Sequence, residues 1–155
     1  RTYFAKKREK MLELNAKINV IGDLSALPED IRESMADIMA ETEPYTDFLL
    51  NICVNYGARQ EIVAAVNAAV SYGRFVDEHS FGELLLTAGL PDPDLIVRTG
   101  GELRLSNFLL YQAAYAELYF SNKMWPAFSK RDLEKAIESY SSRDRRFGNV
   151  REEQK

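Results

Sequence analysis

Cysteine and histidine are almost missing from the sequence. With one cysteine, Cys53, and one histidine, His79, the chain cannot build an internal disulfide framework or a zinc site of several histidines. Apolar runs are short as well, and none approaches the ~18 residues that a membrane-spanning helix needs. These absences predict a soluble protein of a reducing compartment, and we expect it in the cytoplasm.

Positive charge is not in excess either. The chain carries 24 acidic and 20 basic residues, a net charge of −4, whereas a nucleic-acid-binding domain is normally basic. Glycine and proline are few, no stretch of them forms a linker, and no internal repeat divides the sequence. A length of 155 residues with 46% hydrophobic residues is typical of one globular domain. We therefore expect residues 1–155 to belong to a single domain that does not bind nucleic acid.

Strand-like and helix-like segments alternate along the chain. The strand-like segments are β-branched or continuously apolar, and they cover residues 17–23, 48–56, 94–98 and 118–120. Helical patterns cover residues 2–15, 28–42, 59–72, 81–88, 106–115 and 129–140. This alternation predicts an α/β fold, a parallel β-sheet flanked by helices. Four strands make a thin sheet, and the first residue is Arg1 rather than Met, so we expect strands that precede this chain.

Apolar spacing also predicts which helix faces are buried. In the helix over 59–72 the expected core stripe is Ile62, Val63, Val66, Ala69 and Val70. In the last helix Ser129 is the expected N-cap, and the expected buried stripe is Leu133, Ile137 and Tyr140. The strand over 48–56 is apolar on both faces, which favours a place inside a parallel sheet.

The segment after the third strand carries the strongest chemical signal. Arg98 closes that strand, Gly100 and Gly101 follow, and Arg104 and Ser106 stand where a helix is expected to begin. Ligands of open α/β sheets bind beyond the carboxyl ends of the strands, and a helix N-terminus with two guanidiniums attracts phosphate. The pattern predicts a phosphate or diphosphate pocket. The alternative is a glycine turn whose arginines pair with neighbouring acids such as Glu102.

Glu117 is a lone carboxylate among aromatic residues before the last strand. Mg²⁺ binds through one or two carboxylates plus substrate phosphates, so Glu117 is a candidate metal ligand. The alternative is that Glu117 pairs with an arginine of the preceding loop.

The other polar features have structural interpretations. At the turn over 55–59 we expect Gly57 to make the turn and Asn55 to cap, rather than to contact substrate. His79 is expected to be exposed in a loop, and Cys53 to be an unreactive core residue. The basic tail over 143–148 is ordinary chemistry for a helix C-terminus, or it reaches an anionic ligand in a neighbouring subunit.

Several motifs in order along the chain resemble the cis-prenyltransferases, above all the bacterial undecaprenyl diphosphate synthases. They are NYGAR at 55–59, DLIVRTGGELRLSNF at 94–108, YAELYF at 115–120, WPAF at 125–128 and RRFG at 145–148. The resemblance spans essentially the whole chain. It implies an enzyme that condenses isopentenyl diphosphate onto an allylic diphosphate such as farnesyl diphosphate. The implied product is a polyprenyl diphosphate such as undecaprenyl diphosphate, a lipid carrier for the cell wall.

The same resemblance implies roles for individual residues. Arg98, Arg104 and Ser106 would bind the diphosphate of isopentenyl diphosphate, and Leu105 between them would lend its backbone. Glu117 would bind Mg²⁺, the implied cofactor. In a homodimer the tail with Arg146 and Gly148 would reach the partner subunit's site. A long polyprenyl product would bring the enzyme into peripheral contact with a membrane.

The sequence also departs from the family pattern. It contains no His-x-Gly-x-Met-Asp-Gly-Asn-Gly-Arg-type motif, whose Asp belongs to the allylic site, and it has Leu103 where some bacterial relatives have His. We therefore expect residues 1–155 to be the C-terminal portion of a cis-prenyltransferase domain, inactive alone and without a catalytic residue of its own. The alternative is a non-catalytic partner subunit of a heteromeric cis-prenyltransferase. The intact block over 98–107 favours the enzyme, because an accessory subunit has no need of it.

Overall fold

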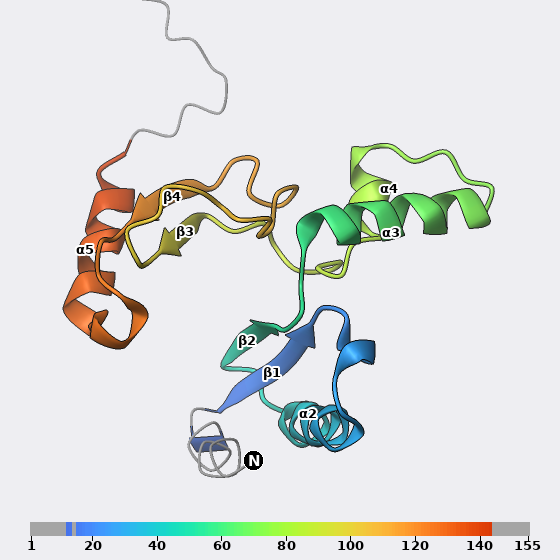
Figure 1. Cartoon of the computed structure of the whole chain (residues 1–155), viewed down its shortest axis with the longest axis horizontal. Helices are drawn as coiled ribbons and strands as arrows, with labels where there is room; N and C mark the ends of the chain where they lie inside the picture. The colour runs from blue at the N-terminus through green and yellow to red at the C-terminus, as the bar shows by residue number, and fades with distance from the viewer. Residues whose placement is uncertain (1–11, 14, 144–155) are drawn as a thin grey trace, which may run out of the picture. The chain divides into compact units, whose positions relative to one another are not determined.

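The computed structural model describes residues 12, 13 and 15–143, and it divides into two compact units between Ala88 and Gly89 (Figure 1). The first unit contains β1 (Ala16–Ile21), the 3-10 helix η1 (Leu24–Ala26), α2 (Glu29–Thr42), β2 (Phe48–Cys53), α3 (Ala58–Ser71) and α4 (Glu78–Gly82). The second contains β3 (Leu95–Arg98), β4 (Glu117–Phe120), the 3-10 helix η2 (Trp125–Ala127) and α5 (Lys130–Ser141). The expectation of a single domain stays a prediction.

In the first unit β1 and β2 pair in parallel along their whole lengths, and α2 connects them. Side chains of a strand alternate between its two faces. On β1 Ala16 and Ile18 share one face and are buried, and Ile21 on the other face is buried as well. Met35 and Ile38 bury the inner face of α2, which packs against β1 (Figure 1). This small core holds the two strands and the helix together.

Thr42, the last residue of α2, ties the helix to the edge of β1. Its side chain is fully buried, and its hydroxyl accepts a hydrogen bond from the Ile18 N–H at 3.0 Å. The same hydroxyl donates to the Ile38 carbonyl at 2.7 Å, within α2. A strand N–H that would otherwise be buried without an acceptor is thus satisfied by a side chain.

In the second unit β3 and β4 pair in parallel, with Leu95 opposite Glu117 and Arg98 opposite Phe120. Helix α5 packs against β4 (Figure 1), and its Ala136 is fully buried. Both units therefore combine parallel strands with flanking helices, so the predicted α/β class is confirmed. Among the helices in the described part of the chain, none is long and apolar enough to cross a bilayer.

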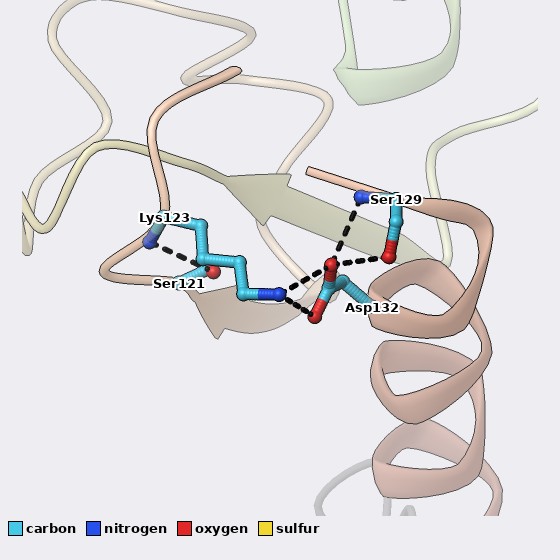
Figure 2. A network of polar contacts seen from close by, with 4 residues as sticks. All are labelled: Ser121, Lys123, Ser129 and Asp132. Carbon is cyan, nitrogen blue, oxygen red and sulfur yellow. Dashed lines mark hydrogen bonds and ion pairs between the residues drawn. The ribbon is translucent and has the colours of Figure 1, made fainter. Parts of the chain in front are cut away.

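A network of polar contacts closes the start of α5, as Figure 2 shows. Ser129 is the N-cap, as predicted, and its N–H and hydroxyl donate to the Asp132 carboxylate at 2.9 and 2.6 Å. The Lys123 ammonium donates to both oxygens of that carboxylate, at 2.7 and 2.8 Å. The hydrogen bonds from Lys123, then those from Ser129, hold the pKa of Asp132 far below its usual range.

Two predicted helices are wrong. Residues 106–115 form successive turns, because Ser106, Asn107 and Leu109 have φ angles of +50°, +64° and +46°, which no right-handed helix contains. Over 81–88, where a helix was expected, Phe81 and Gly82 are the last two residues of α4. Turns follow Gly82.

Two predicted core stripes are also partly wrong. Helix α3 buries Ala58, Glu61, Ala65 and Ala69, while Val63, Val66 and Val70 are exposed. This helix is apolar on more than one face, so its periodicity does not determine which face is inside. In α5 the buried side is Asp132 and Ala136, whereas Leu133 and Ile137 are exposed.

The prediction for the second strand is confirmed in part. β2 forms where a strand was expected and is parallel to β1, but Phe48 and Leu49 at its start are exposed rather than enclosed. Within the first unit β2 pairs with β1.

Replacing Thr42 by valine tests the tie between α2 and β1. Thr42→Val keeps the shape of the side chain but leaves the buried Ile18 N–H without its acceptor, so we expect a loss of about 1–3 kcal/mol in the free energy of unfolding. Urea unfolding followed by circular dichroism measures the change. Thr42→Ser keeps the hydroxyl and is the control. Equal stabilities of Thr42→Val and the wild type would contradict this role.

The lowered pKa of Asp132 makes a contribution to stability that depends on pH. A carboxylate with a lowered pKa stabilises the folded state above its unfolded pKa of about 4, and the contribution is lost as pH falls further toward the folded value. We expect Asp132→Asn to be less stable than the wild type by a constant margin between pH 7 and pH 5, and by a smaller margin at pH 3. Urea unfolding at these three pH values measures the margin. A margin that is the same at pH 3 and pH 7 would refute the prediction.

Candidate functional site

The loop that follows β3 folds back around the guanidinium of Arg98. This side chain donates one hydrogen bond to the Arg104 carbonyl and another to the Ser106 hydroxyl, the latter at 2.9 Å. Residues six and eight positions along the chain are thereby fixed beside the carboxyl end of a strand. The structure therefore brings together three of the predicted site residues, Arg98, Arg104 and Ser106.

Gly100 and Gly101 make the turn that this loop needs. Their φ angles of +93° and +78° lie in the left-handed region that glycine adopts without strain. Their N–H groups donate to the carbonyls of Lys123 and Ser121, at 2.8 and 2.9 Å. The turn is thus held by the chain that follows β4, and its two glycine amides are already used within the fold.

The Arg104 guanidinium is exposed and pairs with Glu102. Its Nη1 lies 2.5 Å from Oε2 of Glu102, and the two side chains are 61% and 51% exposed. This is the pairing that the alternative interpretation of the sequence anticipated. An exposed ion pair contributes only ~0–1 kcal/mol, so a more highly charged anion can replace Glu102.

Ser106 does not begin a helix, which corrects one argument for the pocket. The described turns offer no helix dipole here, so the argument for an anion site rests on the guanidiniums of Arg98 and Arg104 and not on a helix N-terminus. Leu105 is half-buried, and its carbonyl accepts a hydrogen bond from the Phe108 N–H at 3.1 Å. A role of the Leu105 backbone toward a ligand stays a prediction.

Glu117 lies at the other end of the two-stranded sheet. It begins β4 opposite Leu95, whereas Arg98 ends β3, and three residues of strand span roughly 10 Å. Its carboxylate is ion-paired with Arg143, whose guanidinium also donates to the Leu118 carbonyl at 3.3 Å. The alternative of an arginine partner is thus observed, but the arginine follows α5 rather than belonging to the preceding loop.

A magnesium site is not built by these residues on their own. The part of the chain described here holds no group of three or more His, Cys, Asp and Glu side chains that could bind a metal ion. A carboxylate already paired with a guanidinium also meets a positive charge where a cation would have to bind. Glu117 alone is therefore not a complete Mg²⁺ site, and a bound Mg²⁺ would need further oxygen ligands such as substrate phosphates.

In the first unit the turns after β1 and β2 are tied together. The Asn55 amide donates to the Asp23 carbonyl at 2.9 Å, and Gly57, not Asn55, is the N-cap of α3. The expected capping role of Asn55 is therefore wrong. Gly22 is required at the same place, because a Cβ there would lie 2.0 Å from the Val54 carbonyl oxygen.

A cavity of about 490 Å³ opens beside these turns, lined by the turns after β1 and β2, by α3 and by the turns that follow α4. On its wall lies Glu61, which sequence reasoning missed. This carboxylate is only 5% exposed, and it accepts hydrogen bonds from the Leu86 N–H at 2.8 Å and the Tyr56 hydroxyl at 2.6 Å. An acid inside an apolar helical stripe was the signal that could have identified it. Its hydrogen bond to Leu86 connects α3 to the turns that follow α4.

His79 and Cys53 do not form a reactive site. The His79 side chain is 89% exposed, as expected, but it lies on α4 rather than in a loop, 3.6 Å from Glu83. Cys53 is half-buried at the end of β2. Burial, with a smaller effect of Glu61, raises the pKa of its thiol, which keeps it protonated and unreactive. The remaining predicted site residues, Arg146 and Gly148, lie outside the described residues.

Comparison with known proteins gives a consistent family. A family model described as "Putative undecaprenyl diphosphate synthase" matches residues 1–148. An isoprenyl transferase of Thermotoga maritima is 43% identical over 150 residues, which cover 94% of this chain and 64% of that protein. The chain thus spans less than two thirds of the length of this curated relative.

Two solved structures resemble the chain closely. The crystal structure of a probable undecaprenyl diphosphate synthase from Campylobacter jejuni has a TM-score of 0.84 and 34% identity, over 96% of this chain and 70% of that one. Lavandulyl diphosphate synthase from Lavandula x intermedia, solved with dimethylallyl diphosphate, has a TM-score of 0.88 and 32% identity, over 96% and 67%. With its fold, its loop around Arg98 and these matches, the chain belongs to the undecaprenyl diphosphate synthase family of prenyltransferases.

Proposed function

We propose that the chain is part of a cis-prenyltransferase that condenses isopentenyl diphosphate with an allylic diphosphate of the farnesyl diphosphate type. The product would be a polyprenyl diphosphate such as undecaprenyl diphosphate. The observation that carries the proposal is the loop over 98–106, in which Arg98 fixes the backbone of Arg104 and the hydroxyl of Ser106. Membership of a prenyltransferase family supports a diphosphate as the ligand of this arginine loop.

The chemistry assigned to the loop is recognition of the diphosphate of isopentenyl diphosphate. Arg104 presents an exposed, planar fork of N–H donors, which matches pairs of phosphate oxygens. Arg98 and Ser106 are fixed in place before the ligand arrives, so less conformational freedom is lost on binding. Holding the diphosphate at one end orients the double bond of the substrate toward the allylic carbon. A relative's structure with dimethylallyl diphosphate supports an allylic diphosphate as the second substrate.

The proposal extends to the metal ion, the oligomeric state and the cellular location of the complete protein. In the complete protein Glu117 would bind Mg²⁺ together with substrate phosphates, which requires its ion pair with Arg143 to open. A homodimer would bring Arg146 and Gly148 to the partner subunit's site. We further propose a cytoplasmic enzyme that contacts a membrane surface through its long product.

The activity of residues 1–155 alone tests whether this chain is sufficient for catalysis. We propose that it does not catalyse the condensation by itself, because it contains no Asp of the allylic-site motif. Turnover that appears only when a second, different chain is added would support the alternative of a partner subunit in a heteromeric enzyme.

Arg104→Ala tests the loop in the protein as its host makes it. Loss of the charged fork removes charge-assisted hydrogen bonds to the diphosphate, so we expect the KM for isopentenyl diphosphate to rise about 10- to 100-fold. Steady-state kinetics with varied isopentenyl diphosphate measure the change. Arg32→Ala, an exposed and weakly paired arginine of α2, is the matched control and should leave KM unchanged. An unaltered KM in Arg104→Ala would refute the assigned role.

Glu117→Gln tests the proposed metal ligand in the same protein. Loss of one negatively charged oxygen ligand should raise the Mg²⁺ concentration needed for half-maximal activity about tenfold. Activity titrated with MgCl₂ gives that concentration. Glu134→Gln on α5, which is paired with Lys130 at 3.7 Å, controls for loss of an exposed carboxylate. If the two titrations coincide, Glu117 is not the ligand.

A further inference from the structure

The polar network at the start of α5 is connected to the loop over 98–106 through the backbone. The Lys123 ammonium binds Asp132 of α5, while the Lys123 carbonyl accepts the hydrogen bond of the Gly100 N–H at 2.8 Å. Two residues earlier, the Ser121 carbonyl accepts from Gly101 at 2.9 Å. The segment 121–123, which we call the bracing segment, therefore contacts α5 with one side chain and the glycine turn with two carbonyls.

The bracing segment is also connected to β3. The Ser121 N–H donates to the Arg98 carbonyl at 2.8 Å, directly after the last pair of the β3–β4 ladder. The Lys123 N–H donates to the Ser121 hydroxyl at 3.2 Å, which closes a turn within the segment (Figure 2). Each end of the glycine turn is thus bonded to a segment whose single charged anchor is Asp132.

Asp132 does more here than a helix cap requires. A capping box needs one reciprocal pair of hydrogen bonds, and Ser129 already supplies them. Two further hydrogen bonds come from Lys123, and the Asp132 side chain is only 11% exposed, while that of Lys123 is 53% exposed. A mostly buried carboxylate needs a charged partner, so the position of Lys123 is strongly fixed.

We infer that Lys123 and Asp132 are positioning residues for the diphosphate loop: their ion pair fixes the bracing segment, which in turn fixes the Gly100–Gly101 turn and the loop over 98–106. The inference rests on the proposed function of that loop. Neither residue needs to touch the ligand. Their effect is on the placement of Arg98 and Arg104, where a displacement of about 1 Å is enough to weaken binding strongly.

The principal test variant is Lys123→Met, which keeps the length of the side chain and removes its charge. In the protein as its host makes it, we expect the KM for isopentenyl diphosphate to rise about tenfold, with the KM for the allylic diphosphate unchanged. Lys123→Arg keeps an ion pair with Asp132 and should restore most of the affinity. Asp132→Asn should reproduce the effect of Lys123→Met. If Asp132→Asn does not fold, Lys123→Met and Lys123→Arg decide the question.

Hydrogen exchange gives a readout that does not depend on activity. In Lys123→Met the amides of the peptide over 98–106 should exchange about tenfold faster, because the acceptors of Gly100 and Gly101 are no longer held. Ser129→Ala is the matched control. It weakens the cap and lowers the melting temperature, but it leaves the Lys123–Asp132 pair in place, so exchange over 98–106 and KM should stay at wild-type values.

The outcomes separate the two proposals. Faster exchange over 98–106 together with a raised KM supports the positioning role, whereas a KM and exchange rates equal to those of Ser129→Ala overturn it. A lower melting temperature in Lys123→Met with unchanged KM and exchange means that the pair only stabilises the second unit. If Arg104→Ala also leaves KM unchanged, it is the proposed function of the loop that fails.

Discussion

The candidate site depends on the hydrogen bonds that the guanidinium of Arg98 donates. A single planar group at the end of a four-residue strand holds the carbonyl of Arg104 and the hydroxyl of Ser106, and so fixes a loop that has no regular secondary structure. The loop is fixed from the other side by the carbonyls of residues 121 and 123. Without Arg98 the contacts that hold the Arg104 carbonyl and the Ser106 hydroxyl would be lost. Order in this loop therefore comes from the contacts of the Arg98 side chain and from backbone hydrogen bonds to the segment after β4, not from a helix.

Much of the fold could be predicted from the sequence, because local signals agree with tertiary ones. The β-branched run of β1 and the cap at Ser129 each appear within a few residues, and both are observed. The prediction of a helix after Ser106 is wrong for a local reason that hydrophobic periodicity does not reveal. Serine and asparagine at 106 and 107 adopt left-handed backbone angles here, and these interrupt a helix whatever the apolar spacing says. The prediction of the buried face of α3 is wrong for another reason. When a helix is apolar on several sides, the elements that pack against it determine which side is buried.

The candidate site could likewise be predicted from the sequence only in part. Arg98, Arg104 and Ser106 could be grouped from the sequence because they lie within nine residues, and Glu102 could be anticipated as a partner of Arg104. The partner of Glu117 could not, since Arg143 lies 26 residues away and meets it only once α5 has packed on β4. Glu61 was missed because its hydrogen bond to the Leu86 backbone depends on how the turns after α4 fold back onto α3. Long-range contacts of this kind carry no pattern in one sequence.

The ion pair of Glu102 with Arg104 has a consequence for selectivity among anions. The carboxylate of Glu102 is paired with the guanidinium, so an arriving anion would exchange one charged contact for another. A singly charged anion such as acetate gains almost nothing by this exchange. The proposed diphosphate ligand carries several negative charges, so it would gain a net interaction by the same exchange. In the proposed site the internal carboxylate would thus favour highly charged anions over singly charged ones.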